Sequence, residues 1–174
     1  AKLYIRQSFA EDLPGITTVS NLSAAPGDTI TVNGSNLFNA TTVYFSYQPA
    51  VFYRTSNSAL SVIVPDNVVS GDIIVTTPGG VIKKGLFTPT YPALTVNKLQ
   101  TISGVVSGTA FISGSNFYQV TDVRFSTTAP GLWTGSSGFQ VLGSTMISAP
   151  IPINAAWGPI LVMASGRSVS GQST

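Results

Sequence analysis

Residues 34–46 have the sequence GSNLFNATTVYFS, and residues 114–126, 80 positions later, have the sequence GSNFYQVTDVRFS. The similarity extends upstream, so that residues 27–46 align with residues 107–126. A repeat at a fixed offset predicts one structural unit that is used twice. The identical pairs in this alignment are Thr29/Thr109, Gly34/Gly114, Ser35/Ser115, Asn36/Asn116, Thr41/Thr121, Val43/Val123, Phe45/Phe125 and Ser46/Ser126.

The repeated stretch has the pattern of two strands joined by a turn. Apolar and polar residues alternate in Ile30-Thr31-Val32 and again in Val43-Tyr44-Phe45, which is the period of a half-buried strand. Short β-branched runs recur between clusters of Gly, Pro, Asn and Asp along the whole chain, and no helical pattern lasts for three turns. We therefore predict an all-β fold with these residues facing inward: Ile30, Val32, Leu37, Val43 and Phe45 in the first copy, and Ala110, Ile112, Phe117, Val123 and Phe125 in the second.

The Gly-Ser-Asn sequence at 34–36 and at 114–116 leads to two predictions about the turn. Glycine adopts positive φ without steric cost, so Gly34 and Gly114 are expected to do so where the chain leaves the first strand. The Ser-Asn pair that follows each glycine is expected to hydrogen-bond its own backbone and to hold the turn.

The first copy resembles the IPT/TIG family of immunoglobulin-like domains over residues 16–88. The second copy, residues 96–174, keeps part of the pattern but lacks the Pro-Gly turn. The resemblance implies a non-catalytic β-sandwich. In the first copy it rests on Pro26-Gly27, Gly34-Ser35-Asn36-Leu37, Val43-Tyr44-Phe45, Val62-Ile63-Val64-Pro65 and the sequence GDIIVTTPGG at 71–80, and in the second on Gly114-Ser115-Asn116-Phe117 and Val123-Arg124-Phe125.

These observations predict two immunoglobulin-like β-sandwiches in tandem, at 16–88 and 96–174, with a proline-containing linker at 89–95. Residues 1–15 lie outside both copies. They form either an extra edge strand of the first domain or an arm that docks on another subunit. We expect this segment to act in assembly through its apolar residues Leu3, Tyr4, Ile5 and Phe9.

The composition excludes several classes of function. Charged residues make up 8% of the 174 residues, against about 25% in an ordinary soluble domain. The net charge is +2, and the lysines and arginines are scattered apart from Lys83-Lys84, so no basic patch for nucleic acid is expected. No apolar run is long enough to span a membrane. The start, Ala1-Lys2, fits removal of an initiator methionine as well as cleavage of a signal peptide.

The inventory of reactive side chains is also sparse. The chain has no histidine and no cysteine, which excludes disulfides, thiolate catalysis and a histidine base for the serine of the repeated stretch. Asp66 and Asp72 could contribute to a calcium site, but no dense acidic loop surrounds them. The remaining acidic residues do not form a recognisable catalytic pair. We predict no catalytic site, no metal and no cofactor.

Aromatic residues provide the candidate contact sites. Trp133 and Trp157 lie in the two segments that are longer in the second copy, and Trp133 is expected in an exposed loop. Each indole either caps the open end of its own sandwich or contacts a neighbouring subunit or a sugar ring. Tyr44 and Tyr47, with Phe52 and Tyr53, suggest a second aromatic cluster on the first domain, in which Tyr44 points outward.

The leading hypothesis from sequence is a non-catalytic structural protein on a virion surface, such as a decoration, cement or fibre-associated protein. It would bind other subunits in a homo- or hetero-oligomer. The alternative is a carbohydrate-binding or adhesion module of a bacterial surface protein or of a secreted polysaccharide enzyme, with a surface glycan as partner and an extracellular or cell-surface location. A spacer between other domains is the third hypothesis.

Overall fold

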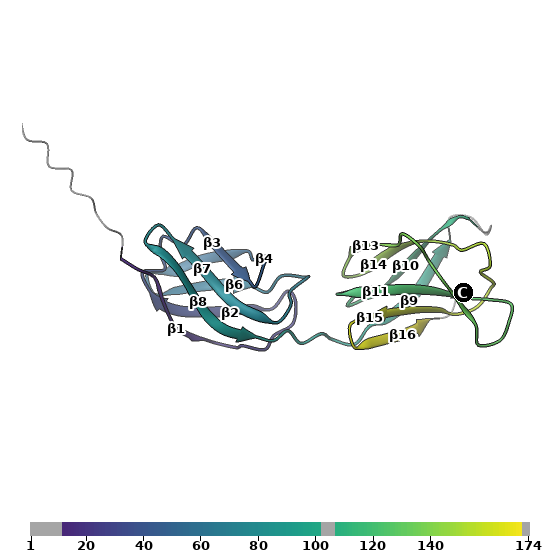
Figure 1. Cartoon of the computed structure of the whole chain (residues 1–174), viewed down its shortest axis with the longest axis horizontal. Coiled ribbons are helices and arrows are strands. Elements are labelled where there is room, and N and C mark those ends of the chain that lie inside the picture. Colours follow the sequence, from purple (N-terminus) through teal and green to yellow (C-terminus); the bar gives the residue numbers. More distant parts are fainter. Residues whose placement is uncertain (1–11, 102–106, 172–174) are drawn as a thin grey trace, which may run out of the picture. The chain divides into compact units, whose positions relative to one another are not determined.

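The computed structural model describes residues 12–101 and 107–171, and these residues form strands, turns and loops with no helix. The predicted all-β fold is confirmed. The chain divides into two compact units, with the boundary between Thr90 and Tyr91. Figure 1 shows strands in both units, which we call domain 1 and domain 2.

Domain 1 is a sandwich of two four-stranded antiparallel sheets. One sheet has the order β1-β2-β6-β5 and the other the order β4-β3-β7-β8. The strands are β1 (Gly15–Val19), β2 (Thr29–Ser35), β3 (Thr42–Phe45), β4 (Gln48–Pro49), β5 (Phe52–Ser56), β6 (Ala59–Ile63), β7 (Gly71–Thr77) and β8 (Gly80–Phe87).

Domain 2 repeats this topology strand for strand. Its sheets have the orders β9-β10-β14-β13 and β12-β11-β15-β16, so each strand corresponds to the domain 1 strand numbered eight lower. The repeated sequence supplies β2 and β3 in domain 1, and β10 and β11 in domain 2. The strands are β9 (Thr95–Thr101), β10 (Thr109–Ser115), β11 (Val120–Ser126), β12 (Trp133–Gly135), β13 (Gln140–Gly143), β14 (Met146–Pro150), β15 (Ile160–Ala164) and β16 (Arg167–Gly171).

Each domain has its own hydrophobic core. In domain 1 the Phe45 ring meets the Phe87 ring edge-on, with centroids 4.7 Å apart. All ten residues that the repeat predicts to face inward are at most 4% exposed, which confirms both the strand phase and the alignment of the two copies: Ile30, Val32, Leu37, Val43, Phe45, Ala110, Ile112, Phe117, Val123 and Phe125.

The repeated glycine serves close packing, and the prediction of positive φ at Gly34 and Gly114 is wrong. Positive φ occurs two residues later, at Asn36 (55°) and Asn116 (62°). A Cβ atom on Gly34 would overlap the carbonyl oxygen of Gly15, and one on Gly114 would overlap that of Thr95. A register shift in β1 and in β9 falls opposite the same glycines. Glycine therefore lets the bulged first strand approach the second.

The repeated asparagine reaches much further along the chain than the expected local turn bond. Asn36 Nδ2 donates to the Leu13 carbonyl at 3.0 Å, and Asn116 Nδ2 donates to the Ala93 carbonyl at 2.7 Å. In each domain the asparagine thus fastens the segment that leads into the first strand. The prediction of a self-contained turn is wrong because the side chain spans 23 residues of sequence.

The last shared residue of the repeat has the same role in both copies. The backbone N–H of Ser46 donates to the Asp72 carbonyl at 2.7 Å, and that of Ser126 donates to the Pro159 carbonyl at 3.2 Å. Each serine side chain lies against a glycine, Gly71 or Gly158, where a Cβ atom would overlap the hydroxyl. This shared position therefore joins β3 to β7 and β11 to β15.

Hydrogen bonds divide the expected linker, residues 89–95, between the two domains. The N–H groups of Thr88 and Thr90 donate to the carbonyls of Leu22 and Ala24 in domain 1 at 2.9 and 3.0 Å. From Tyr91 onward the chain belongs to domain 2. Strands β1 and β9 begin at Gly15 and Thr95, one residue before the domain starts expected from sequence.

Candidate functional site

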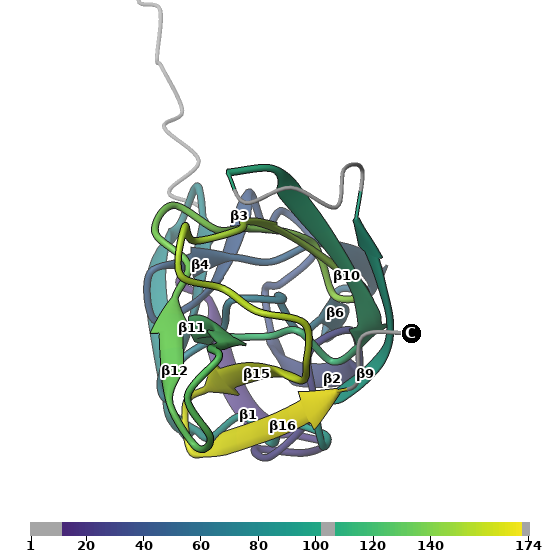
Figure 2. The same cartoon turned by 90° about the vertical axis from the view of Figure 1, so that its right-hand side faces the viewer.

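Both tryptophans are positioned around the end of β11. Trp133, the first residue of β12, pairs with Ser126, the last residue of β11. The N–H of Ala156, next to Trp157, donates to the Ser126 carbonyl at 2.8 Å. Figure 2 shows β12 beside β11. Two residues that are far apart in sequence thus lie near one serine. We call Leu132, Trp133 and Trp157 the tryptophan surface.

Trp157 is the most solvent-exposed part of this surface. The residue is 81% exposed, so its indole does not cap the core of domain 2. The turn that carries it is held from both sides, because Ser126 Oγ donates to the Ala156 carbonyl at 3.3 Å in addition to the backbone bond above. Gly158 then packs against the Ser126 hydroxyl. The backbone therefore presents a large apolar side chain to solvent from an anchored turn.

Trp133 differs from the sequence expectation. It was expected in an exposed loop, but it begins strand β12 and is half-buried. The loop prediction is wrong because Trp133–Gly135 pairs with Arg124–Ser126 and so closes a hairpin edge. The preceding residue, Leu132, is 62% exposed.

Domain 1 has counterparts at both tryptophan positions. Phe45 of β3 pairs with Gln48, and the equivalent residue of β11, Phe125, pairs with Thr134. Gln48 therefore corresponds to Thr134, and the residue before it, Tyr47, corresponds to Trp133. Tyr47 is 68% exposed. Gly71 and Gly158 are equivalent, because they pack against Ser46 and Ser126. The residue before each glycine is Ser70 in domain 1 and Trp157 in domain 2, so Ser70 corresponds to Trp157. An aromatic residue thus occupies the first position in both domains, whereas the second is tryptophan only in domain 2.

The other sequence candidates do not join this surface. Tyr44 lies in β3, half-buried, opposite Pro49 and Ile74. Phe52 and Tyr53 lie in β5 of the other sheet, so the expected aromatic cluster of domain 1 is divided between two sheets. The arm candidates Leu3, Tyr4, Ile5 and Phe9 lie outside the described residues.

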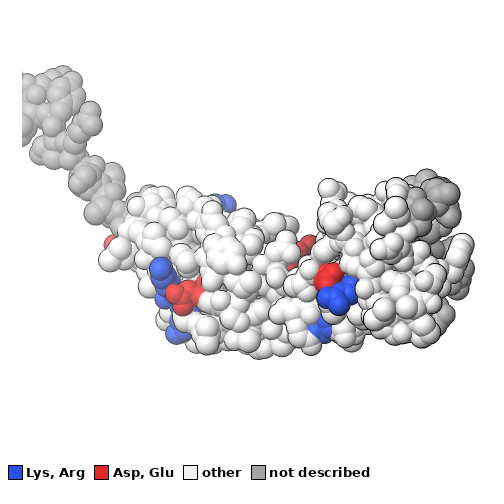
Figure 3. Space-filling model, turned by 45° about the vertical axis from the view of Figure 1, so that its right-hand side comes forward, with Lys and Arg blue, Asp and Glu red and all other residues white. Residues whose placement is uncertain are grey.

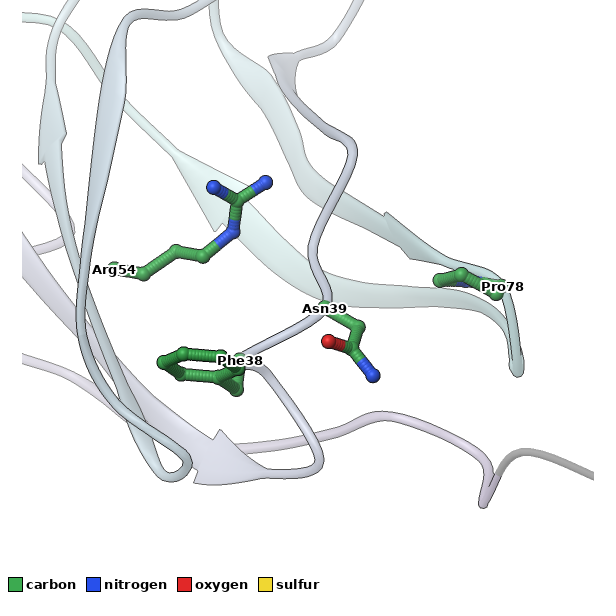
Figure 4. Close-up of a pocket in the computed structure, with 4 residues that line it drawn as sticks. All are labelled: Phe38, Asn39, Arg54 and Pro78. Carbon is green, nitrogen blue, oxygen red and sulfur yellow. The ribbon is translucent and has the colours of Figure 1, made fainter.

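A second candidate site is an open hollow of about 440 Å³ on domain 1, lined by Phe38, Asn39, Arg54 and Pro78. Figure 4 shows the Phe38 ring and the Arg54 guanidinium on one side and Pro78 on the other. The lining comes from the β2–β3 turn, from edge strand β5 and from the β7–β8 turn. Sequence reasoning missed this hollow because three separate segments form it. The one sequence signal is that Phe38 and Asn39 differ from their counterparts Tyr118 and Gln119.

Arg54 is partly fixed in this hollow. Its Nη2 donates to the Ala40 carbonyl at 2.5 Å, and its guanidinium carbon lies 5.6 Å from the centroid of the Phe52 ring. Phe38 is 56% exposed, although the preceding residue, Leu37, is fully buried. A cation and an exposed ring therefore line the same open space.

Arg167, by contrast, has an internal structural role. Its guanidinium donates to the carbonyls of Pro92 and Tyr118, both at 2.6 Å, and lies 4.8 Å from the Tyr91 ring centroid. Partial burial lowers the pKa of Arg167 below its ordinary value, and the electrostatic interaction with Tyr91 partly opposes this lowering. The arginine fastens the start of domain 2 to β16.

Acidic residues form no candidate centre in the described part of the chain. No group of three or more Asp or Glu residues gathers there as metal ligands would. Asp122 is paired with Arg124 at 2.7 Å, and Asp28 accepts the Ala25 N–H at 2.8 Å. Figure 3 shows only scattered charged residues on the face in view. The described residues also contain no helix suited to crossing a membrane.

The fold and its repeated contacts define a tandem pair of immunoglobulin-like β-sandwiches. Residues 14–91, which include all the strands of domain 1, match the family model of the IPT/TIG domain. No curated protein matches the chain.

Of three solved structures that match this chain, the first alone has a TM-score above 0.5. The surface glycan-binding protein PbSGBP-B from Prevotella bryantii is 17% identical, with a TM-score of 0.55 over 92% of this chain and 41% of its own. An SGBP-B of Bacteroides ovatus, in complex with a mixed-linkage heptasaccharide, is 21% identical with a TM-score of 0.36 over 91% and 41% of the two chains. The plexin A4 extracellular region is 18% identical, with a TM-score of 0.40 over 82% and 13%. The chain thus spans about two fifths of the length of the glycan-binding proteins.

Proposed function

We propose that the chain is a non-catalytic module of an extracellular or cell-surface protein and that the tryptophan surface of domain 2 binds glycan. The observation that carries this proposal is Trp157, which is 81% exposed on a turn anchored to Ser126. An anchored turn loses little conformational entropy when a ligand binds, and this preorganisation favours affinity.

The chemistry of the surface suits a neutral saccharide. An indole combines a broad apolar face with one N–H donor. A pyranose ring has a face of C–H groups and a rim of hydroxyls, so it can stack on the indole while its rim stays hydrated. Leu132 and Trp133 lie at the same end of β11, on the side of β12, whereas Trp157 lies on the side of β15. The proposed role is binding rather than chemistry, because the chain has neither histidine nor cysteine and its six carboxylates form no recognisable catalytic pair in the sequence.

The fold comparison supports a surface protein over a virion protein. PbSGBP-B, whose fold extends over most of this chain, is a surface glycan-binding protein. The virion hypothesis rests on the sparse charge, the start of the chain, the apolar N-terminal arm and the absence of a catalytic inventory, and the described residues add no support for it. We therefore place the glycan-binding hypothesis first.

Replacing Trp157 by Ala tests the proposal. We expect affinity for a neutral β-linked gluco-oligosaccharide to fall by about 2 kcal/mol or more, as for a dominant aromatic contact. The melting temperature should hardly change, because the exposed indole contributes little burial. Calorimetric titration and thermal unfolding of the intact chain measure the two effects.

Tyr53→Ala is the matched control, since Tyr53 is an aromatic residue, 61% exposed, on an edge strand of domain 1. It should leave affinity unchanged. Equal binding by Trp157→Ala and the unmodified chain would refute the assignment of the site. A panel of neutral oligosaccharides that shows no binding to the unmodified chain would refute the function. Loss of self-association in Trp157→Ala would instead indicate a contact between subunits.

A further inference from the structure

We infer that the hollow formed by Phe38, Asn39, Arg54 and Pro78 on domain 1 is a second binding site, and that it binds a saccharide bearing a carboxylate, such as a uronic acid unit. This inference is independent of the proposed function, because it concerns another domain, other residues and a charged class of ligand.

The cation is held in place before a ligand arrives. The Ala40 carbonyl accepts from Arg54 Nη2, and the Phe52 ring lies against the guanidinium. Arginine carries five N–H donors, and one contact of this kind leaves a pair of donors for a second partner. A planar carboxylate matches such a pair with two parallel charge-assisted bonds.

The other lining residues favour a ligand that is larger and less polar than a simple anion. The Phe38 ring is 56% exposed and borders the space, and Pro78 bounds it on another side (Figure 4). These apolar surfaces suit the C–H face of a sugar ring, whereas phosphate or acetate would leave them wet. The hollow has a volume of about 440 Å³ and is open to solvent, so it is a surface groove and not an enclosed pocket.

Electrostatics favour the same class of ligand. Among the residues that the structure describes, no aspartate or glutamate lines the hollow. The chain carries few charges, and its net charge is +2. The positive potential of Arg54 is therefore not cancelled by a carboxylate in the lining, and an acidic ligand meets no like charge there.

The test uses the full chain carrying Trp157→Ala, so that Trp157, the residue that carries the proposed glycan site, cannot contribute. Tri-galacturonate is titrated beside a neutral galactose trimer, acetate and inorganic phosphate. We expect the acidic trimer to bind at least tenfold more tightly than the other three. Binding should weaken at least tenfold in Arg54→Lys, because lysine keeps the charge but cannot donate two parallel hydrogen bonds to a carboxylate. It should also weaken at least tenfold in Phe38→Ala.

Lys83→Gln is the control for charge, because it removes one exposed cation from β8 that is not among the residues lining the hollow. It should leave binding unchanged. Thermal unfolding checks that Arg54→Lys remains folded. The inference is overturned by equal binding of acidic and neutral trimers, by full binding in Arg54→Lys or Phe38→Ala, by phosphate or acetate binding as well as the acidic trimer, or by the absence of binding. Failure here leaves the proposed role of Trp157 untouched.

Discussion

Replacing Phe45 by Ala should lower the free energy of unfolding of domain 1 by about 3–5 kcal/mol, the usual cost of removing a buried aromatic ring. Phe45 is fully buried and meets Phe87 edge-on at 4.7 Å. Truncation therefore removes apolar burial, leaves a cavity and breaks the ring pair. Denaturant unfolding, followed by signals assigned to each domain, measures the change.

Two comparisons make this result specific. Tyr47→Ala removes another aromatic residue of the same hairpin, but Tyr47 is 68% exposed, so the expected loss is small. The transition of domain 2 should stay in place, because the two cores contain separate sets of residues. A Phe45→Ala protein as stable as the unmodified chain would contradict the burial and the repeat alignment.

The second large effect is expected at Gly34. A Cβ atom there would overlap the carbonyl oxygen of Gly15, and a backbone group cannot rotate away as a side chain can. Gly34→Ala must therefore push β1 away from β2 at the bulge. We expect a loss of about 3 kcal/mol, at the upper end of the usual cost of overpacking, and a clear fall in the melting temperature of domain 1.

Gly85→Ala is the matched control. Gly85 lies in β8 and has no positive φ, and a Cβ atom on it would meet nothing within 4 Å beyond its own chain neighbours. Its replacement should be neutral or slightly stabilising, because alanine restricts the unfolded chain more than glycine does. If Gly34→Ala were equally harmless, the close approach of β1 to Gly34 would not exist in solution.

Sequence alone predicted the fold because the core depends on a simple period. Strand alternation places Ile30 and Val32 on one face, and the same pattern recurs in domain 2. Burial of apolar side chains dominates the energetics, so a correct strand phase identifies most of the core. The tandem arrangement could be predicted because the same alternating pattern occurs twice in the sequence, 80 residues apart.

The roles of individual turn residues could not be predicted in this way. Gly34 and Asn36 act on Gly15 and Leu13, which lie in another strand and in the segment before it. Local propensity describes how a residue affects its neighbours in sequence. It contains no information on which distant strand packs against that residue in the folded domain. The hollow around Arg54 was missed for a similar reason, since three segments meet only after folding.

The two copies also separate structural from functional positions. Asn36 and Asn116, which are identical in the two copies, make equivalent contacts in both domains. The candidate binding residues lie where the copies differ. Phe38 corresponds to Tyr118, and the turn before the glycine at 71 or 158 carries Ser70 in one domain and Trp157 in the other. The two proposed binding sites thus include positions at which the copies differ.

The most direct test of the glycan-binding proposal follows the two indole N–H resonances of the intact chain by NMR, because the sequence contains two tryptophans. Trp157→Ala assigns the signals by removing one of them. On titration with a neutral β-linked gluco-oligosaccharide, the Trp157 signal should shift progressively to saturation, and the Trp133 signal should shift less because that side chain is half-buried. An indole signal of Trp157 that stays in place while the oligosaccharide binds elsewhere, or while it does not bind, would contradict the proposal.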